Sequence, residues 1–271
     1  RMGFPAEERE IIVVDNGSTD RTAEIVKRYP VRYLWEERRG AASARNRGIE
    51  ASQGKILAFT NADCVVTTEW LTELTRGFDE DGIGAVEGKT VAYPPVTSAE
   101  RYRAMTRSSS HQGRHASPLA PYVSTANVAF RREVFDRIGL FDPRLEGALD
   151  NDFTVRFFQG TDLTLRYNPK AIVFLRHRRT GTDFFRQYMK YGRGLAMLRA
   201  KYPERLPWGW QQELRAWAAV GKFGLAAAEA AVRYGGKDGK VMDTYSPYFT
   251  FLRKLAVRLG FLRGMLAGGL Q

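Results

Sequence analysis

The sequence predicts an α/β protein with a mostly parallel sheet flanked by helices, followed by a helical, basic C-terminal extension. In the first half, short β-branched runs alternate with helical segments, which is typical of strand–helix–strand crossovers. After residue 175 this alternation stops and the pattern is helical. We therefore expect two domains, one over residues 1–175 and a helical, basic one over residues 176–271.

The composition indicates a folded protein in a reducing compartment. Of its 271 residues, 44% are hydrophobic and 27% are charged, which excludes a disordered chain. Cys64 is the one cysteine, so a disulfide framework and a multi-cysteine zinc site are both excluded. Uncharged apolar runs stay shorter than the roughly 18 residues that a membrane-spanning helix needs.

The net charge of +12 is unevenly distributed along the chain. Residues 1–175 contain 24 basic and 24 acidic side chains, whereas residues 176–271 contain 18 basic and 6 acidic ones. A neutral body with a basic extension indicates a docking segment. The extension has no recognisable nucleic-acid-binding motif, so we expect no nucleic-acid partner.

The elements of the first half are bounded by turn and cap residues. Asn16-Gly17-Ser18 forms a turn after the first strand, and Thr19-Asp20 can cap the helix that follows it. The predicted order is a strand at 10–15, a helix to about residue 29, a strand at 31–36, a helix at 41–52, a strand at 55–60, a helix at 67–78 and a strand at 84–93.

The pattern resumes after a segment without periodicity. Residues 107–121 are rich in Ser, His, Gly and Pro and predict a loop. The elements expected after it are a strand at 123–130, helices at 132–138 and 150–159, and strands at 163–167 and 171–175.

Polar residues follow two of the predicted strands, where such a sheet places its ligands. Asp15 ends the first strand and can accept hydrogen bonds from a base or a ribose. Asn61 and Asp63 follow the strand at 55–60, and Asp63 suits a divalent cation that bridges diphosphate oxygens. A turn and a helix cap account for the same residue types, so the residues alone leave both interpretations open.

Two further groups of polar residues also allow both a structural and a functional interpretation. Asp150 and Asp152 open a helix, where they can act as partners of the helix dipole or supply a general base. His177 lies in a run of arginines directly after a strand. It is either a solvated surface residue or a ligand of a metal or phosphate.

Five motifs in one order resemble the family-2 inverting glycosyltransferases, which have the GT-A nucleotide-sugar fold. They are VVDNGSTD, ARNRGIEASQGKILAFTNADC, STANVAFRREVFDRIGLFDPRL, GALDNDF and YGRG. The resemblance covers residues 8–200. The resemblance implies transfer of a sugar from a nucleoside-diphosphate donor, with a UDP-sugar favoured, to a hydroxyl of a glycan or lipid-linked acceptor. It also implies inversion at the anomeric carbon, dependence on Mg²⁺ or Mn²⁺, and a role in cell-envelope glycan or glycolipid synthesis.

The resemblance also implies roles for individual residues. Asp150 corresponds to the general base that deprotonates the acceptor hydroxyl. Asp15 corresponds to the carboxylate that contacts the nucleotide base, and Asp63 to the last residue of the Asp-X-Asp motif, which binds the metal. Such a base activates the nucleophile while the cation neutralises charge on the leaving diphosphate.

The remaining predicted site residues are assigned to the donor and to the metal. Asn61 stands where relatives have an Asp near the ribose, and Arg45 and Asp152 are expected to contact the substrate. Relatives have a metal-binding His at the position of Leu175, so His177 is the candidate replacement. Side chains two residues apart on a strand point to the same side, which makes this replacement geometrically feasible.

Two other departures from the family bear on activity. Leu149 replaces the Glu of the family's Glu-Asp pair, and the first strand that relatives have ahead of the VVD motif is not found here. We therefore expect an N-terminally short domain. The alternative to an enzyme is a non-catalytic sugar- or nucleotide-binding relative of the same fold.

The C-terminal extension mixes aromatic, aliphatic and basic residues at helical spacing. Helices are predicted over 182–201, 208–234 and 249–270. Either they pack on the catalytic domain with a solvated basic face, or they form an interfacial surface on anionic lipid. A lipid-linked acceptor favours the second arrangement, so we expect a cytoplasmic protein that is peripheral at the inner face of the membrane.

Overall fold

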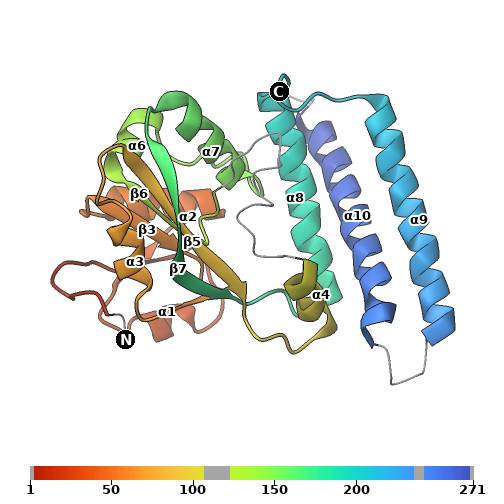
Figure 1. The fold of residues 1–271 in the computed structure, drawn as a ribbon, viewed down its shortest axis with the longest axis horizontal. Helices are drawn as coiled ribbons and strands as arrows, with labels where there is room; N and C mark the ends of the chain where they lie inside the picture. Colours follow the sequence, from red (N-terminus) through yellow and green to blue (C-terminus); the bar gives the residue numbers. More distant parts are fainter. Residues whose placement is uncertain (1–2, 107–122, 235–240, 269–271) are drawn as a thin grey trace. The chain divides into compact units, whose positions relative to one another are not determined.

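The chain forms two compact units in the computed structural model, which describes residues 3–106, 123–234 and 241–268 (Figure 1). Within these residues the first unit comprises 3–91 and 123–174, and the second comprises 92–106, 175–234 and 241–268. The second unit therefore includes a segment that the sequence boundary at residue 175 assigned to the first domain. The loop predicted over residues 107–121 lies outside the described residues.

The first unit has the predicted alternation of strands and helices. Its elements are β1 (Ile12–Asp15), α1 (Thr22–Val26), β2 (Arg32–Trp35), α2 (Ala41–Ala51), β3 (Ile56–Thr60), β4 (Cys64–Val66), α3 (Trp70–Arg76), β5 (Ile83–Ala92), β6 (Asn127–Arg131), α6 (Arg132–Ile138), α7 (Leu149–Gly160) and β7 (Thr164–Leu175). The two strands expected at 163–167 and 171–175 are the single strand β7. β6 begins later than expected because Ser124–Asn127 forms a turn, with Asn127 N donating to Ser124 O at 3.0 Å.

The strands form two sheets. β1 and β2 are parallel, with Asp15 opposite Trp35, and the second sheet has the order β3-β6-β5-β7-β4. The α/β fold class is confirmed, but the larger sheet is mixed in direction because β6 is antiparallel to both β3 and β5. The antiparallel direction of β6 was not predicted. The connection from β5 to β6 contains α4, which belongs to the second unit.

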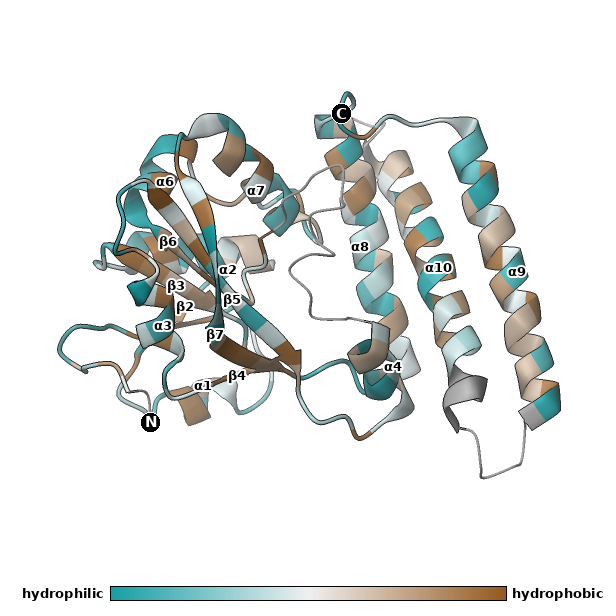
Figure 2. Ribbon diagram, in the orientation of Figure 1, coloured by the Kyte–Doolittle hydropathy of each residue, from teal (hydrophilic) through white to brown (hydrophobic). Residues whose placement is uncertain are grey.

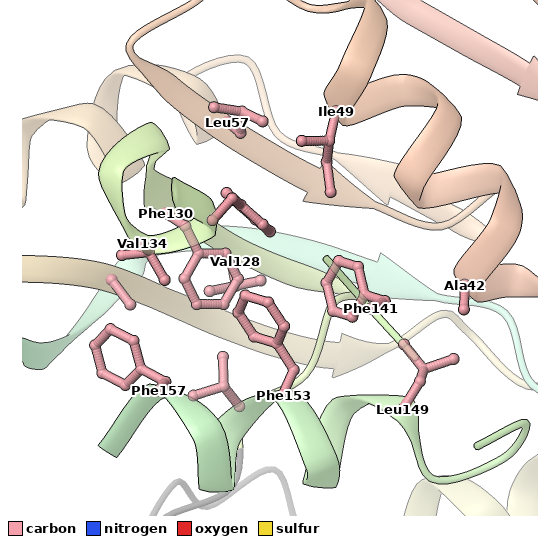
Figure 3. Packing of buried hydrophobic residues seen from close by; sticks show 13 residues of the cluster. Ala42, Ile49, Leu57, Val128, Phe130, Val134, Phe141, Leu149, Phe153 and Phe157 are labelled. Atoms are coloured by element: carbon pink, nitrogen blue, oxygen red, sulfur yellow. The ribbon is translucent and has the colours of Figure 1, made fainter. Parts of the chain in front are cut away.

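A cluster of aromatic rings fixes α7 against the larger sheet. Phe130 of β6 packs against Phe153 and Phe157 of α7, and Figure 3 shows these rings pointing toward one another. The centroids of Phe141 and Phe153 are 4.4 Å apart. Burying one such ring contributes about 1.5–3 kcal/mol. The start of α7, with its acidic residues, is therefore held firmly in place.

A buried amide joins four elements on the other side of the sheet. Asn127 accepts a hydrogen bond from the indole Nε1 of Trp70 at 2.8 Å and donates to the backbone oxygens of Lys89 and Ala171 at 3.0 and 2.9 Å. A Cβ at Gly88 would overlap the oxygen of Ala171, so this junction requires glycine. It connects β5, β6, β7 and α3 without leaving the amide unsatisfied.

The second unit consists of helices. They are α4 (Ser98–Thr106), α8 (Gly181–Lys201), α9 (Trp210–Tyr234) and α10 (Val241–Gly268), and α10 packs between α8 and α9 (Figure 1). A Cβ at Gly260 would overlap the backbone oxygen of Met189, and one at Gly192 would overlap that of Val257. Small residues of this kind permit close contact between helix backbones.

The two units differ in how hydrophobic residues are distributed. Figure 2 shows brown residues concentrated on the strands of the first unit, whereas α8, α9 and α10 each carry both brown and teal residues. Among the residues that the structure describes, no helix is both long and apolar enough to cross a membrane.

Candidate active site

Asp150 lies in the first turn of α7 and is held through both carboxylate oxygens. Thr125 Oγ1 donates to Oδ1 at 2.6 Å, and the Thr125 backbone N–H donates to Oδ2 at 3.3 Å. The helix dipole also favours a negative charge at this position. The carboxylate predicted to be the general base therefore has a fixed orientation.

The turn that carries Thr125 is itself tied to its neighbours. Thr154 Oγ1 donates to Asp150 O at 2.6 Å and accepts from Val123 N at 3.2 Å. Ser124 N donates to Glu87 Oε1 of β5 at 3.4 Å. These contacts join α7, β5 and the start of β6, so Thr125 is preorganised before any ligand binds.

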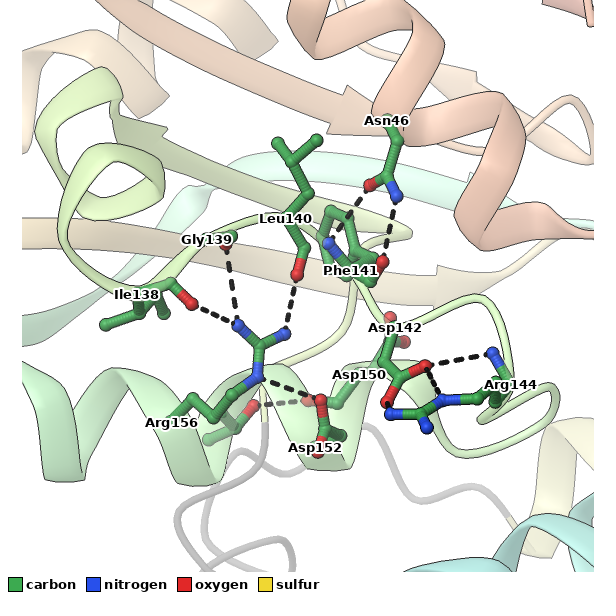
Figure 4. A network of polar contacts seen from close by, with 11 residues as sticks. Asn46, Ile138, Gly139, Leu140, Phe141, Asp142, Arg144, Asp150, Asp152 and Arg156 are labelled. Carbon is green, nitrogen blue, oxygen red and sulfur yellow. Dashed lines mark hydrogen bonds and ion pairs between the residues drawn. The ribbon is translucent and has the colours of Figure 1, made fainter.

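Asp152 has a structural role in place of the predicted substrate contact. Its side chain has no exposed surface, and Oδ2 pairs with Arg156 Nε at 2.9 Å (Figure 4). Arg156 in turn donates to the backbone oxygens of Ile138 and Leu140 at 2.6 and 2.8 Å. The carboxylate faces the protein interior because residue 152 lies on the buried side of α7, about 200° around the helix from Asp150.

The segment before α7 is held from a second side by Asn46 of α2. Its Nδ2 donates to Phe141 O at 2.8 Å, and its Oδ1 accepts from Phe141 N at 3.0 Å (Figure 4). Neither Asn46 nor Arg156 is among the residues that the sequence predicted. The four-residue spacing of Asp152 and Arg156 was a usable signal for their ion pair. The contact of Asn46 joins residues 95 positions apart, and no local pattern indicates it.

Asp15 is 3% exposed and ends β1, as predicted. Burial acts to raise the pKa of its carboxyl group, but hydrogen bonds from Ser18 and Tyr33 outweigh burial, so the pKa lies below its ordinary value of 3.8. Ser18 N donates to Oδ1 at 2.8 Å and the Tyr33 hydroxyl donates to Oδ2 at 3.0 Å. An ionised Asp15 retains lone pairs that can accept a further bond from a ligand.

The turn after Asp15 is crosslinked to the segment after β2. Asn16 Nδ2 donates to the backbone oxygens of Glu36 and Arg38, both at 2.9 Å, and its Oδ1 accepts from Gly40 N at 2.7 Å. Gly17 has a φ of 77°, a conformation that disfavours other residues. These contacts shape the loop next to Asp15.

Arg45 and Asn61, both predicted to contact the substrate, are in direct contact with each other. Arg45 Nη2 of α2 donates to Asn61 Oδ1, just after β3, at 2.8 Å. Because Asn61 is neutral, this contact leaves the positive charge of the guanidinium uncompensated by that partner. An Asp at the same position would form an ion pair with Arg45.

Asp63 lies in the turn between β3 and β4 and is half-buried. Within residues 3–106, 123–234 and 241–268 there is no group of three or more His, Cys, Asp or Glu side chains that can hold a metal ion. Mg²⁺ commonly binds through one or two carboxylates together with substrate phosphates, so Asp63 fits a cation that is shared with a diphosphate.

His177 lies just past β7 and is half-buried. It belongs to the second unit, whereas Asp63 belongs to the first. Their shared role in binding a metal stays a prediction.

Comparison with known proteins identifies the class to which this fold and site belong. The family model for glycosyl transferase family 2 matches residues 3–139, and the chain belongs to this family. Glycosyltransferase AglE of Haloferax volcanii is 33% identical over 161 residues, which are 56% of this chain and 52% of AglE. The pre-mycofactocin glycosyltransferase of Mycobacterium tuberculosis is 28% identical over 248 residues, which are 86% of this chain and 51% of that protein. The chain thus spans about half the length of these curated relatives.

Solved structures confirm the GT-A fold. The mannosyltransferase PcManGT from Pyrobaculum calidifontis, in complex with GDP-Man and Mn²⁺, matches with a TM-score of 0.62 and 21% identity, over 96% of this chain and 80% of that one. Residues 1–349 of S. aureus TarS, in complex with UDP-GlcNAc, match with a TM-score of 0.52 and 15% identity, over 97% of this chain and 85% of that one. The chain therefore belongs to glycosyl transferase family 2 and has the GT-A fold.

Proposed function

We propose that this glycosyltransferase transfers a sugar from a nucleoside-diphosphate donor to an acceptor hydroxyl with inversion at the anomeric carbon. The observation that carries this proposal is the pair of hydrogen bonds from Thr125 that orients Asp150 at the start of α7. A carboxylate fixed in this way can accept the proton of a hydroxyl as the oxygen attacks. A single displacement on the face opposite the leaving group gives inversion.

The donor would be bound by residues at the carboxyl ends of β1 and β3 and on α2. Asp15 would accept a hydrogen bond from the nucleotide base, and Asn61 one from a ribose hydroxyl. Arg45 is held beside Asn61 and would contact the diphosphate with its guanidinium. PcManGT was solved with GDP-Man and TarS with UDP-GlcNAc, so both nucleotide classes occur among similar folds; we favour a UDP-sugar here.

Asp63 would hold Mg²⁺ or Mn²⁺ together with the diphosphate. A bound cation would neutralise the charge that develops on the departing diphosphate. PcManGT was solved with Mn²⁺, which supports a divalent cation in this fold. Since Asn61 brings no charge, we expect weaker cation binding than an Asp-X-Asp motif provides.

The acceptor is proposed to be a glycan or a lipid-linked molecule used in cell-envelope synthesis. The protein would then lie on the cytoplasmic face of the membrane as a peripheral protein. The basic excess over residues 176–271, 18 basic against 6 acidic side chains, supports this location because anionic lipid attracts it.

Asp150→Asn is the direct test of the proposed chemistry. We expect the variant to bind donors with unchanged affinity and to lose transfer by about 10³-fold or more, since the amide cannot accept the proton. Donor binding is measured by calorimetry with Mn²⁺ and a panel of UDP- and GDP-sugars, and transfer by release of the nucleoside diphosphate.

Asp136→Asn is the matched control, because Asp136 is exposed on α6. It should leave both readouts unchanged. Transfer by the Asp150→Asn variant at the wild-type rate would remove Asp150 from the mechanism.

A further inference from the structure

Helix α9 presents a continuous apolar stripe to solvent. Trp210, Leu214, Leu225 and Val232 are 65%, 59%, 76% and 88% exposed. Successive members are separated by four, eleven and seven residues, which is close to one, three and two turns at about 3.6 residues per turn. The exposed residues between them on the same side are small and uncharged. We call the set the α9 stripe: Trp210, Leu214, Ala218, Gly221, Leu225, Ala228 and Val232.

The α9 stripe is not the face that packs within the second unit. Val220 and Ala230 are the buried residues of α9, and they lie on other sides of the helix. Glu213 pairs with Arg258 of α10 at 2.8 Å, and Lys254 of α10 lies over the ring of Phe223. The helix is thus held by one face, while a second apolar face is turned outward.

Basic side chains border the stripe. Arg215, Lys222 and Arg233 are exposed and are spaced seven and eleven residues apart, so they line a neighbouring face along the length of α9. The acidic residue on this side is Glu229, which pairs with Arg233 at 2.7 Å. Trp210 stands at the N-terminal end of the stripe. Apolar residues beside basic ones, with a tryptophan at one end, are typical of a helix that lies in a membrane interface.

We propose that the α9 stripe is the surface through which this protein lies on an anionic bilayer, with α9 in the plane of the interface. The net charge of the C-terminal region favours lipid over a second copy of the chain as the partner of the stripe. Residues 176–271 carry 18 basic and 6 acidic side chains, so two copies repel each other whereas anionic headgroups attract the surface. The proposal deepens the peripheral location proposed above and does not depend on the roles assigned to Asp150 or Asp63.

The test is co-sedimentation of the full chain with vesicles of phosphatidylcholine alone or with phosphatidylglycerol. We expect binding to the anionic vesicles, and weaker binding at high salt. Leu225→Gln with Val232→Gln should weaken binding at least about tenfold, because two apolar side chains no longer enter the interface. The matched control is Met105→Gln with Val96→Gln, since both residues are exposed, at 62% and 67%, and belong to the second unit but not to α9. It should bind like the wild type.

Each other outcome contradicts the proposal. Equal binding to neutral vesicles, no binding to either kind, or an equal loss in the control pair would overturn it. A dimer in analytical ultracentrifugation that the stripe variant dissociates would assign the stripe to a second copy instead. Donor binding by the stripe variant is measured in parallel and should match the wild type. Failure of the surface proposal can therefore be distinguished from failure of the proposed reaction.

Discussion

Thr125 donates a hydrogen bond to each carboxylate oxygen of Asp150, from its hydroxyl to Oδ1 at 2.6 Å and from its backbone N–H to Oδ2 at 3.3 Å. We expect Thr125→Val to lower kcat about 10- to 100-fold, because the carboxylate loses the stronger of these two contacts and its orientation. KM for the donor should stay unchanged, since Thr125 is proposed to act through Asp150. Thr125→Ser keeps the hydroxyl and should restore most of the rate. A general loss of stability would instead affect both variants, which thermal unfolding checks.

The ion pair of Asp152 and Arg156 should stabilise the folded protein. Arg156→Met removes the ion-pair contact that Arg156 Nε makes with the fully buried carboxylate of Asp152, and we expect a loss of about 3–5 kcal/mol in the free energy of unfolding. Asp152→Asn with Arg156→Met should cost less than the sum of the single changes, because both single changes disrupt the same ion pair. Urea denaturation measures both.

The matched control for that experiment is Arg137→Gln. Arg137 pairs with Glu133 and Asp162 at the surface, and such pairs contribute about 0–1 kcal/mol. A loss for Arg156→Met no larger than that for Arg137→Gln would show that the buried pair does not stabilise the fold.

The pKa of Asp15 predicts how stability depends on pH. Burial acts to raise the pKa of Asp15 in the folded protein, but the hydrogen bonds from Ser18 and Tyr33 outweigh burial and lower this pKa. The ionised carboxylate therefore stabilises the fold above the unfolded pKa, and this contribution is lost as pH falls through the folded pKa. Asp15→Asn should flatten the decline in stability on the acid side of about pH 4. Tyr33→Phe removes one bond and should move the decline to higher pH. If the wild type, Asp15→Asn and Tyr33→Phe lose stability in the same way as the pH falls, the Asp15 carboxylate is not the group that causes the decline.

Close contact between helix backbones should make Gly260 intolerant of any side chain. Gly260→Ala places a methyl group on the backbone of Met189, so we expect destabilisation of the second unit. Gly221→Ala is the matched change in α9, where nothing lies within 4 Å of the added Cβ. Alanine is the better helix former by about 1 kcal/mol, so this control should be neutral or stabilising. Thermal unfolding followed by circular dichroism distinguishes the two.

Periodicity in the sequence was sufficient for the fold class and for most element positions. The alternation up to residue 175 predicted the strands and helices of the first unit except β4, and the helical pattern after it predicted α8, α9 and α10. Helix α4 was not predicted. The direction of β6 could not be predicted in this way. Strand direction depends on how the intervening chain returns, and that chain includes α4, which packs in the other unit.

The positions of Asp15 at the end of a strand and of Asp150 in the first turn of a helix were predictable from the sequence, and their roles stay predictions. Asp152 shows the limit of this reasoning. Its position in the first turn of α7 suggested a ligand contact, but a helix turns residues 150 and 152 toward different sides. Which side is buried depends on the aromatic cluster around Phe153, and that cluster combines residues from distant parts of the chain.

The separate pairing of β1 with β2 has a consequence for how the donor site would behave over time. A sheet of two strands is marginal by itself and depends on the helices that cover it, here chiefly α2. Backbone amides of β1 and β2 should therefore exchange with solvent hydrogen sooner than those of β5 and β6, which lie inside the five-stranded sheet. A nucleotide held by Asp15 would slow that exchange. Binding of the donor could then be followed by slower amide hydrogen exchange in eight residues, Ile12–Asp15 and Arg32–Trp35.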